Sequence, residues 1–262
     1  MKFNYVLNWD DKCDYKPREV AVDIEGIDAN DHIIKRITKT KTFYEIELLN
    51  YLLVRAPKGG VYIDIGANIG NHAVYFGKFL ASHVVCIEPS PKIAKLLKRN
   101  LTENQVDNHV IVGCALGSVG GEGRMLYPDN DNIGMTKVVS NTGGGNGEMV
   151  EIRTLDEVFE SLNMSEQISL IKIDVEGMEL DVLKGAVGLL KAHQPQLVIE
   201  AATQKEQESI FEYLSPLGYV PCAQFCQTPT FHMIIPNVHK LRKTTLFYKF
   251  VRVARKVQRL FA

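Results

Sequence analysis

The stretch YIDIGANIG, residues 62–70, joins an apolar strand to a glycine-containing turn. Asp64 interrupts the apolar run, and Gly66 and Gly70 lie on either side of Asn68. Glycine permits tight turns and lets other groups come close to the backbone. In doubly wound sheets, ligands bind beyond the carboxyl ends of the strands, where such turns lie. The stretch therefore predicts a ligand site at the end of a buried parallel strand.

Strand-like and helix-like segments alternate around this stretch. Apolar runs typical of buried strands occupy residues 60–66, 83–89, 109–117, 168–177 and 195–202. Segments predicted to be helical lie beside and between them, at residues 43–56, 71–81, 90–104, 178–193 and 204–218. A closing antiparallel pair is expected at residues 219–225 and 230–236. This alternation predicts an α/β fold with a single doubly wound, mostly parallel sheet covered on both faces.

Three regions lie outside this alternating core. Residues 1–42 are expected to form an N-terminal cover with short strands and no helix of useful length. Residues 118–150 are rich in turn-forming residues and predict a hairpin with a functional loop. The alternating domain itself is expected to span residues 43–236, followed by a basic amphipathic C-terminal helix over residues 237–262.

The composition is typical of a soluble globular protein. The chain has 262 residues, of which 45% are hydrophobic and 23% charged, which suffices for one large core. The five cysteines lack the paired spacing of a zinc site, so reduced thiols in a cytoplasmic protein are expected; they are Cys13, Cys86, Cys114, Cys222 and Cys226. The absence of a signal-peptide pattern and of an apolar run of about 18 residues argues against a membrane span.

The C-terminal segment 237–262 differs from the rest of the chain in charge. It contains eight Lys/Arg and no Asp/Glu, whereas the whole chain has 30 Lys/Arg and 31 Asp/Glu. The remaining acidic body is therefore not expected to bind nucleic acid. A helix here would carry an apolar stripe beside a basic one. Three roles remain open: packing on the body or on a second subunit of a homodimer, peripheral binding to the inner face of an anionic membrane, and a nucleic-acid contact.

Glu88 ends the strand-like run that follows the glycine turn, 24 residues after Asp64. An acidic residue at this place can accept hydrogen bonds from both ribose hydroxyls of a bound nucleoside. A dinucleotide site would need the G-x-G-x-x-G pattern so that helix amides meet a pyrophosphate, whereas Asp64 would repel phosphate. The two carboxylates favour an adenosine-containing ligand with a positively charged extension.

Five motifs follow one another in the order found in one enzyme family. They are VYIDIGANIGNHAVYFG from residue 61, CIEPSP from 86, CALGSVGG from 114, IRTLDEV from 152 and IKIDVEGMELDVLKGA from 171. Between about residues 43 and 236 the chain resembles an FkbM-type S-adenosylmethionine-dependent methyltransferase. The resemblance implies a seven-stranded, Rossmann-like sheet, S-adenosyl-L-methionine as cofactor, and O-methylation of a sugar, glycan precursor or related natural product.

The same resemblance implies which residues hold the cofactor, and it leaves the acceptor-binding loop at residues 120–147 unassigned. Around the methionine part it implies Asp64, Gly66, Asn68 and Gly70. Glu88 would hold the ribose, and the adenine would lie near Cys114, Ala115 and Leu116.

Methyl transfer to a hydroxyl also needs a group that removes the hydroxyl proton. Asp174 and Glu176 follow the fourth strand-like run and are expected to face the transferred methyl group. His232 is a further candidate base, although a lone histidine in an apolar strand is more often a core residue. Glu179 is either a third carboxylate of the site or an acid at a helix start. Asp174 and Glu176, with Glu200, would offer oxygen ligands to Mg²⁺, but no metal-binding spacing is present and no metal is expected.

Two other functions remain open from the sequence. An NAD-dependent oxidoreductase would use a related sheet, and the missing G-x-G-x-x-G pattern counts against it. A non-catalytic nucleotide-binding module is the second alternative, against which the intact carboxylates at positions 64, 88, 174 and 176 argue.

Overall fold

The fold is taken from a computed structural model of the whole chain, which describes residues 1–7, 18–27, 31–126, 137–140 and 147–239. The predicted C-terminal helix and the roles considered for it fall almost entirely on residues 240–262, outside the described residues. Cys13 also lies outside them.

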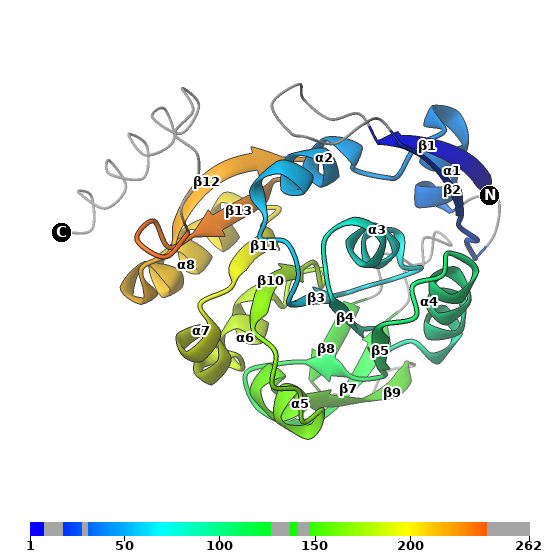
Figure 1. Cartoon of the computed structure of the whole chain (residues 1–262). Coiled ribbons are helices and arrows are strands. Elements are labelled where there is room, and N and C mark those ends of the chain that lie inside the picture. Colours follow the sequence, from blue (N-terminus) through cyan, green and yellow to red (C-terminus); the bar gives the residue numbers. More distant parts are fainter. Residues whose placement is uncertain (8–17, 28–30, 127–136, 141–146, 240–262) are drawn as a thin grey trace.

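A seven-stranded sheet forms the centre of the molecule, in the order β12-β13-β11-β10-β3-β4-β5 (Figure 1). Its strands are β3 (Val61–Ile65), β4 (His83–Ile87), β5 (His109–Val112), β10 (Ile168–Ile173), β11 (Gln196–Glu200), β12 (Val220–Phe225) and β13 (Thr230–Ile234). Neighbours from β5 to β11 pair in parallel, and β13 runs antiparallel between β11 and β12. The predicted mostly parallel sheet and its closing antiparallel pair are confirmed.

The chain order reverses between β3 and β10. From β3 the chain continues outward to β4 and β5, and it then returns to build β10 and β11 on the other side. Such a switch point leaves a crevice at the carboxyl ends of the two central strands. The predicted ligand turn at residues 62–70 lies there.

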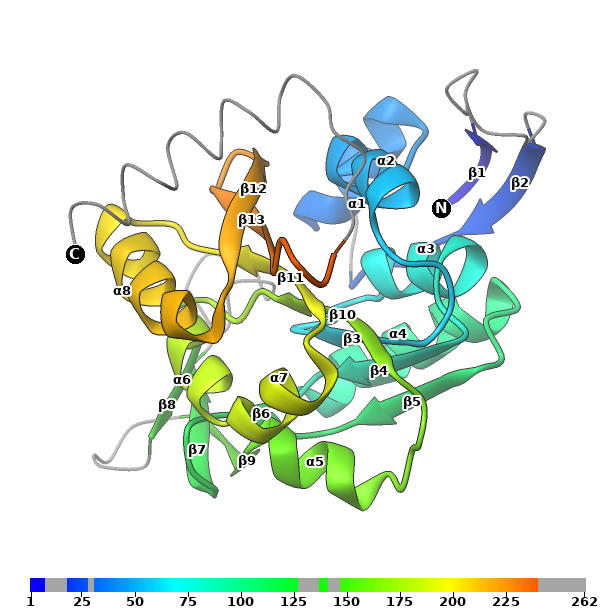
Figure 2. The same cartoon turned by 60° about the vertical axis from the view of Figure 1, so that its left-hand side comes forward.

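Helices cover both faces of this sheet (Figure 2). One face packs against α2 (Ile46–Arg55), α3 (Asn71–Phe79) and α4 (Pro91–Glu103), and the other against α5 (Leu155–Ser161), α6 (Glu179–Lys184), α7 (Val187–His193) and α8 (Gln204–Leu214). Side chains alternate between the faces along each strand, so Tyr62 and Leu170 join the first core, whereas Ile63 and Ile171 join the second.

The N-terminal cover contains a hairpin and a helix. Strands β1 (Lys2–Leu7) and β2 (Arg18–Asp23) pair antiparallel, and α1 (His32–Thr40) follows them. The prediction that this region has no useful helix was wrong. Asp31 caps α1 by accepting a hydrogen bond from Ile34 N at 3.0 Å, while Ile37 is its one fully buried residue. The apolar stripe is too short to stand out in the sequence.

Two buried asparagines, one in α4 and one at its C-cap, tie the cover to the core. Asn100 Oδ1 accepts a hydrogen bond from Glu25 N at 2.8 Å, and Asn100 Nδ2 donates to Glu25 O at 2.8 Å and to Ile69 O at 2.7 Å. Asn104 Oδ1 accepts from Asp23 N at 3.0 Å. Because Ile69 belongs to the glycine turn, one side chain anchors both the cover and that turn.

A second, four-stranded sheet has the order β6-β9-β7-β8. It consists of β6 (Ala115–Leu116), β7 (Gly121–Leu126), β8 (Lys137–Ser140) and β9 (Glu148–Arg153). Strands β7 and β8 form the hairpin predicted for residues 118–150. The single strand predicted at residues 109–117 is instead divided between β5 of the main sheet and β6 of this one.

The helix predicted at residues 178–193 is also divided, into α6 and α7. Gly185 ends α6, and a Cβ there would lie only 2.1 Å from Gly117 O. The helix therefore ends where its backbone packs closely against the segment that follows β6.

The cysteines within the described residues are free thiols, as predicted. Cys86, Cys114 and Cys222 are buried and Cys226 is partly buried. The cytoplasmic location inferred from them stays a prediction. Among the described residues, no helix combines the length and the apolar character needed to cross a bilayer.

Candidate active site

The glycine turn after β3 is fixed by its neighbours on both sides. Gly66 has a φ of 72°, and a Cβ there would lie 1.8 Å from Asp174 O, so only glycine fits. The N–H groups of Gly66 and Ala67 both donate to Ile87 O at 3.1 Å. Asn68 adopts a left-handed conformation with a φ of 48°. The turn is therefore held between the ends of β4 and β10.

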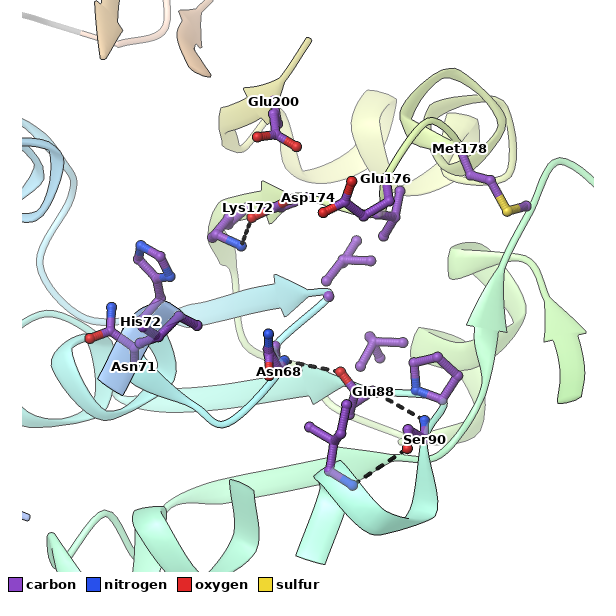
Figure 3. Close-up of a pocket in the computed structure, with 18 of the residues that line it drawn as sticks. Asn68, Asn71, His72, Glu88, Ser90, Lys172, Asp174, Glu176, Met178 and Glu200 are labelled. Atoms are coloured by element: carbon purple, nitrogen blue, oxygen red, sulfur yellow. Dashed lines mark hydrogen bonds and ion pairs between the residues drawn. The ribbon is translucent and has the colours of Figure 1, made fainter. Parts of the chain in front are cut away.

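A cavity of about 490 Å³ opens at the carboxyl ends of the central strands (Figure 3). This volume lies in the range of small-molecule sites. The predicted residues that line it are Gly66, Asn68, Glu88, Cys114, Ala115, Leu116, Asp174 and Glu176. Three predicted residues, Asp64, Gly70 and His232, are not part of its lining.

Gly70 acts through packing at the start of α3. It has a φ of 88°, and a Cβ there would lie 2.6 Å from Leu97 Cδ1 of α4. This glycine therefore lets α3 approach α4, while the expected contact of Gly70 with the methionine part of a cofactor stays a prediction.

Glu88 presents a fixed carboxylate to the cavity. Its Oε2 accepts a hydrogen bond from Asn68 N at 3.0 Å, and its Oε1 accepts from Ser90 N at 2.9 Å. Burial raises the pKa of Glu88 to about 7, although these two hydrogen bonds act in the opposite direction. Each oxygen can accept a further bond. Glu88 is thus placed and oriented as the predicted ribose-binding residue should be.

Asp64 lies in the core beneath the cavity rather than in its wall. It is 0% exposed, and its Oδ1 lies 3.5 Å from Lys172 Nζ. The parallel register places these two residues side by side on β3 and β10. Neither oxygen of Asp64 accepts a hydrogen bond from the described residues. Asp64 therefore holds Lys172, and its expected direct contact with the cofactor stays a prediction.

Lys172 is a cavity residue that the sequence reasoning missed. It is 3% exposed, and its Nζ lies 3.2 Å from Asp174 Oδ2. Burial alone would lower the pKa of Lys172, but Asp174 and Asp64 raise it well above its ordinary value, so the amine stays charged. The available signal was a lysine within the otherwise apolar run ISLIKI, residues 168–173.

The pKa values of the neighbouring carboxyl groups of Asp174 and Glu200 shift in opposite directions. Burial acts to raise the pKa of Asp174, but Lys172 and a hydrogen bond from Glu200 hold it below its ordinary value. Burial and the adjacent Asp174 raise the pKa of Glu200 to about 9. The proton therefore resides on Glu200, which donates to the Asp174 carboxylate.

Glu176 completes a group of three carboxylates (Figure 3). One carboxylate oxygen from each of Asp174, Glu176 and Glu200 lies within 4.8 Å of the others. The expectation that no metal is required stays a prediction. Glu179 lies outside the cavity lining and shapes the turn that carries Glu176: its Oε1 accepts from Val175 N and from Gly177 N, both at 3.1 Å.

His232 is a core residue and is withdrawn as a candidate base. It is 0% exposed on β13. Its Nε2 lies 2.8 Å from Gln196 Oε1, and its Nδ1 lies 3.0 Å from Cys222 Sγ and 3.2 Å from Tyr51 OH. Burial lowers the pKa of His232 to about 3, so the ring stays neutral.

A further wall of the cavity comes from the start of α2 and of α3. Tyr44, Glu45 and His72 line it, and Glu45 Oε2 lies 3.1 Å from His72 Nε2. Burial acts to raise the pKa of Glu45, but its interactions with His72, Lys172 and Cys226 together outweigh burial and lower that pKa. Asn71 holds this wall by accepting from Tyr44 N at 2.9 Å. The Tyr44–Asn71 and Glu45–His72 contacts each join residues 27 positions apart in the sequence. No sequence motif pointed to Tyr44 or Glu45 as site residues.

The family model for the FkbM methyltransferase domain matches residues 64–234. The chain belongs to the FkbM methyltransferase family. The match extends from Asp64 in β3 to the end of β13, so it includes most of the main sheet and the glycine turn.

Two sequence relatives are named as methyltransferases, and a solved structure shares the fold. Methyltransferase sdnD from Sordaria araneosa is 29% identical over 164 residues, covering 52% of this chain and 63% of that protein. Hexuronic acid methyltransferase AglP from Haloferax volcanii is 29% identical over 150 residues, covering 56% and 59%. This chain thus spans about six tenths of the length of these relatives. The FkbM methyltransferase structure from Methylobacillus flagellatus superposes with a TM-score of 0.51 at 21% identity, covering 70% of this chain and 46% of that one, and shares the fold.

Proposed function

We propose that this FkbM-family chain is an S-adenosylmethionine-dependent O-methyltransferase whose acceptor is a hydroxyl of a sugar, glycan precursor or related natural product. One observation carries the proposal. A single cavity joins a fixed carboxylate suited to a ribose, Glu88, to an ionised carboxylate suited to proton removal, Asp174. The relative named hexuronic acid methyltransferase supports a sugar-derived acceptor.

The residues that line the cavity support the proposed cofactor. Glu88 would accept hydrogen bonds from the ribose hydroxyls, and Ala115 with Leu116 would supply apolar contacts to the adenine. The turn at Gly66 and Asn68 would accommodate the methionine part beside acidic groups, as a cation requires. When bound, S-adenosyl-L-methionine supplies an electrophilic methyl group on a positively charged sulfur.

Asp174 is the proposed base. The acceptor O–H bond breaks as its oxygen bonds to the methyl carbon, and the proton passes to the Asp174 carboxylate. Lys172, 3.2 Å away, keeps Asp174 ionised before the reaction. Glu200 already carries its proton and donates to Asp174, so it orients this base and does not compete for the acceptor proton.

The proposal is tested by incubating the full chain with S-adenosyl-L-methionine and a panel of glycans and glycan precursors. Mass spectrometry should show a gain of one methylene unit on at least one acceptor. Asp174→Asn should lose this product while it still binds S-adenosylhomocysteine. Protection from thermal unfolding by NAD but not by S-adenosylhomocysteine would instead favour an oxidoreductase, and cofactor binding without product across the panel would favour a non-catalytic module.

A further inference from the structure

Tyr44 is a partly buried residue of the cavity wall whose position is fixed through its backbone. Asn71, the first residue of α3, accepts a hydrogen bond from Tyr44 N at 2.9 Å and donates one to Tyr44 O at 3.1 Å. Asn71 itself is 2% exposed. The ring of His32 packs edge-on against the ring of Tyr44, with centroids 5.7 Å apart. These contacts hold Tyr44 beside the start of α3, directly after the glycine turn.

The hydroxyl group of Tyr44 takes no part in these contacts. The phenol oxygen forms no hydrogen bond with the described residues. By contrast, the buried Tyr219 donates from its hydroxyl to Pro195 O at 2.8 Å. Buried tyrosine hydroxyls usually have such a partner. A tyrosine hydroxyl in a cavity wall without one is available to a bound molecule.

The charges around this hydroxyl show where it lies in the cavity. Burial raises the pKa of Tyr44, and four ionisable neighbours raise it further: Glu45, Cys226, Asp174 and Glu200. The hydroxyl therefore lies within electrostatic range of the proposed base, Asp174. Because its pKa is raised, it stays protonated at neutral pH and can donate a hydrogen bond.

Two parts of the ligands could receive this hydrogen bond, and the charges favour one of them. A carboxylate of the cofactor would be repelled near Glu45 and Asp174. The acceptor hydroxyl is neutral, and its oxygen must come within hydrogen-bond distance of the base that takes its proton. The region around Asp174 that holds the acceptor oxygen is also the region that holds the Tyr44 hydroxyl.

We propose that the Tyr44 hydroxyl donates a hydrogen bond to the acceptor oxygen that is methylated, and thereby holds this oxygen beside Asp174. The inference rests on the proposed function and adds a substrate-binding residue to it. The acceptor oxygen has two lone pairs, so one accepts from Tyr44 while the other forms the bond to the methyl carbon. The acceptor proton passes to Asp174, the electron pair of the broken methyl–sulfur bond remains on sulfur, and Tyr44 keeps its own proton.

The test compares Tyr44→Phe, which removes only the hydroxyl, with the wild type and with Tyr213→Phe. Tyr213 lies on α8 outside the cavity lining, and its hydroxyl donates to Leu183 O at 3.3 Å. Activity is measured with an acceptor that the glycan panel yields. The kcat/KM for this acceptor should fall roughly three- to tenfold in Tyr44→Phe, the scale of one neutral hydrogen bond, and should stay within about twofold in Tyr213→Phe.

Two further measurements do not depend on the acceptor. Calorimetry should give the same Kd for S-adenosylhomocysteine in Tyr44→Phe and in the wild type. The urea midpoint should also be unchanged in Tyr44→Phe, whereas Tyr219→Phe loses the bond to Pro195 O and should have a lower midpoint. A weaker Kd in Tyr44→Phe would assign the hydroxyl to the cofactor, and a lower midpoint would show a structural role. Either result would overturn the inference.

The activity measurement separates this inference from the proposed function. Wild-type turnover with an unchanged kcat/KM in Tyr44→Phe would refute the inference alone. A loss of about 10²-fold or more, as expected for Asp174→Asn, would make Tyr44 the base and would also overturn it. Wild-type protein that methylates no acceptor of the panel would refute the proposed function, and this inference with it.

Discussion

Replacing Lys172 with methionine should destabilise the fold through the buried Asp64. Methionine keeps most of the apolar side-chain length of lysine and removes the charge. Asp64 would then remain at 0% exposure, without its ion pair at 3.5 Å and without a hydrogen bond from the described residues. Removing one partner of a buried ion pair costs about 3–5 kcal/mol of unfolding free energy, and we expect a loss in this range.

The loss should depend on pH with a definite sign. Burying an unpaired carboxylate costs more free energy than burying a neutral group. The variant should therefore lose least stability at low pH, where carboxylates take up protons, and more as the pH rises. Urea unfolding followed by circular dichroism should therefore show a larger deficit relative to wild type at pH 8 than at pH 5.

A double variant separates the charge effect from packing. Asp64→Asn combined with Lys172→Met removes both charges, and it should be more stable at pH 8 than Lys172→Met alone by at least about 1 kcal/mol. A single variant that loses less than about 1 kcal/mol, or a double variant that loses the sum of the two single losses, would refute the account of this pair. Should Lys172→Met not fold, folded double variant protein would still show the coupling.

Three further predictions concern Asp174, Asn100 and Glu88. Asp174→Asn should lower kcat by about 10²-fold or more while the Kd of S-adenosylhomocysteine stays within a few-fold; a retained kcat would exclude Asp174 as the base. Asn100→Ala removes three hydrogen bonds between α4, the cover and the glycine turn. In urea unfolding it should lower the unfolding free energy by about 3 kcal/mol. A loss below about 1 kcal/mol would show that the cover is held by other contacts. Because burial raises the pKa of Glu88 to about 7 and the ionised form is the better acceptor for ribose hydroxyls, affinity for S-adenosylhomocysteine should fall as pH drops from 8 to 5.5. Glu88→Gln should flatten that profile, and an equally steep profile in this variant would assign the titration to another group.

The parts of the fold that depend on local pattern could be predicted from the sequence. Runs of neighbouring residues predicted the strands of the main sheet, the turn at Gly66 and the acidic residue Glu88 at a strand end. Elements set by tertiary packing could not be predicted in this way. The strand that follows α4 is divided between two sheets, and the helix after Met178 breaks at Gly185 because the chain near Gly117 comes close.

The candidate site likewise combines residues predictable from local pattern with residues placed by tertiary packing. Lys172 gains its place from the register of β3 against β10, which no spacing within either strand reveals. The pairing of Glu45 with His72 likewise joins the start of α2 to the start of α3. His232 looked like a candidate base in the sequence, but the contacts that make it a core residue come from β11, β12 and α2. Roles that arise from contacts between distant segments required the structure.

The most direct test of the account is the binding of S-adenosylhomocysteine to the full chain and to two matched variants, measured by calorimetry at pH 8. The wild type should bind in the micromolar range or tighter. Glu88→Gln should weaken binding by at least about tenfold, because charge-assisted hydrogen bonds contribute about 1.5–3 kcal/mol each. Glu179→Gln keeps an oxygen for the Val175 and Gly177 amides and should change Kd by less than a few-fold. No binding by the wild type, or equal losses in the two variants, would contradict the assignment of this cavity as a cofactor site.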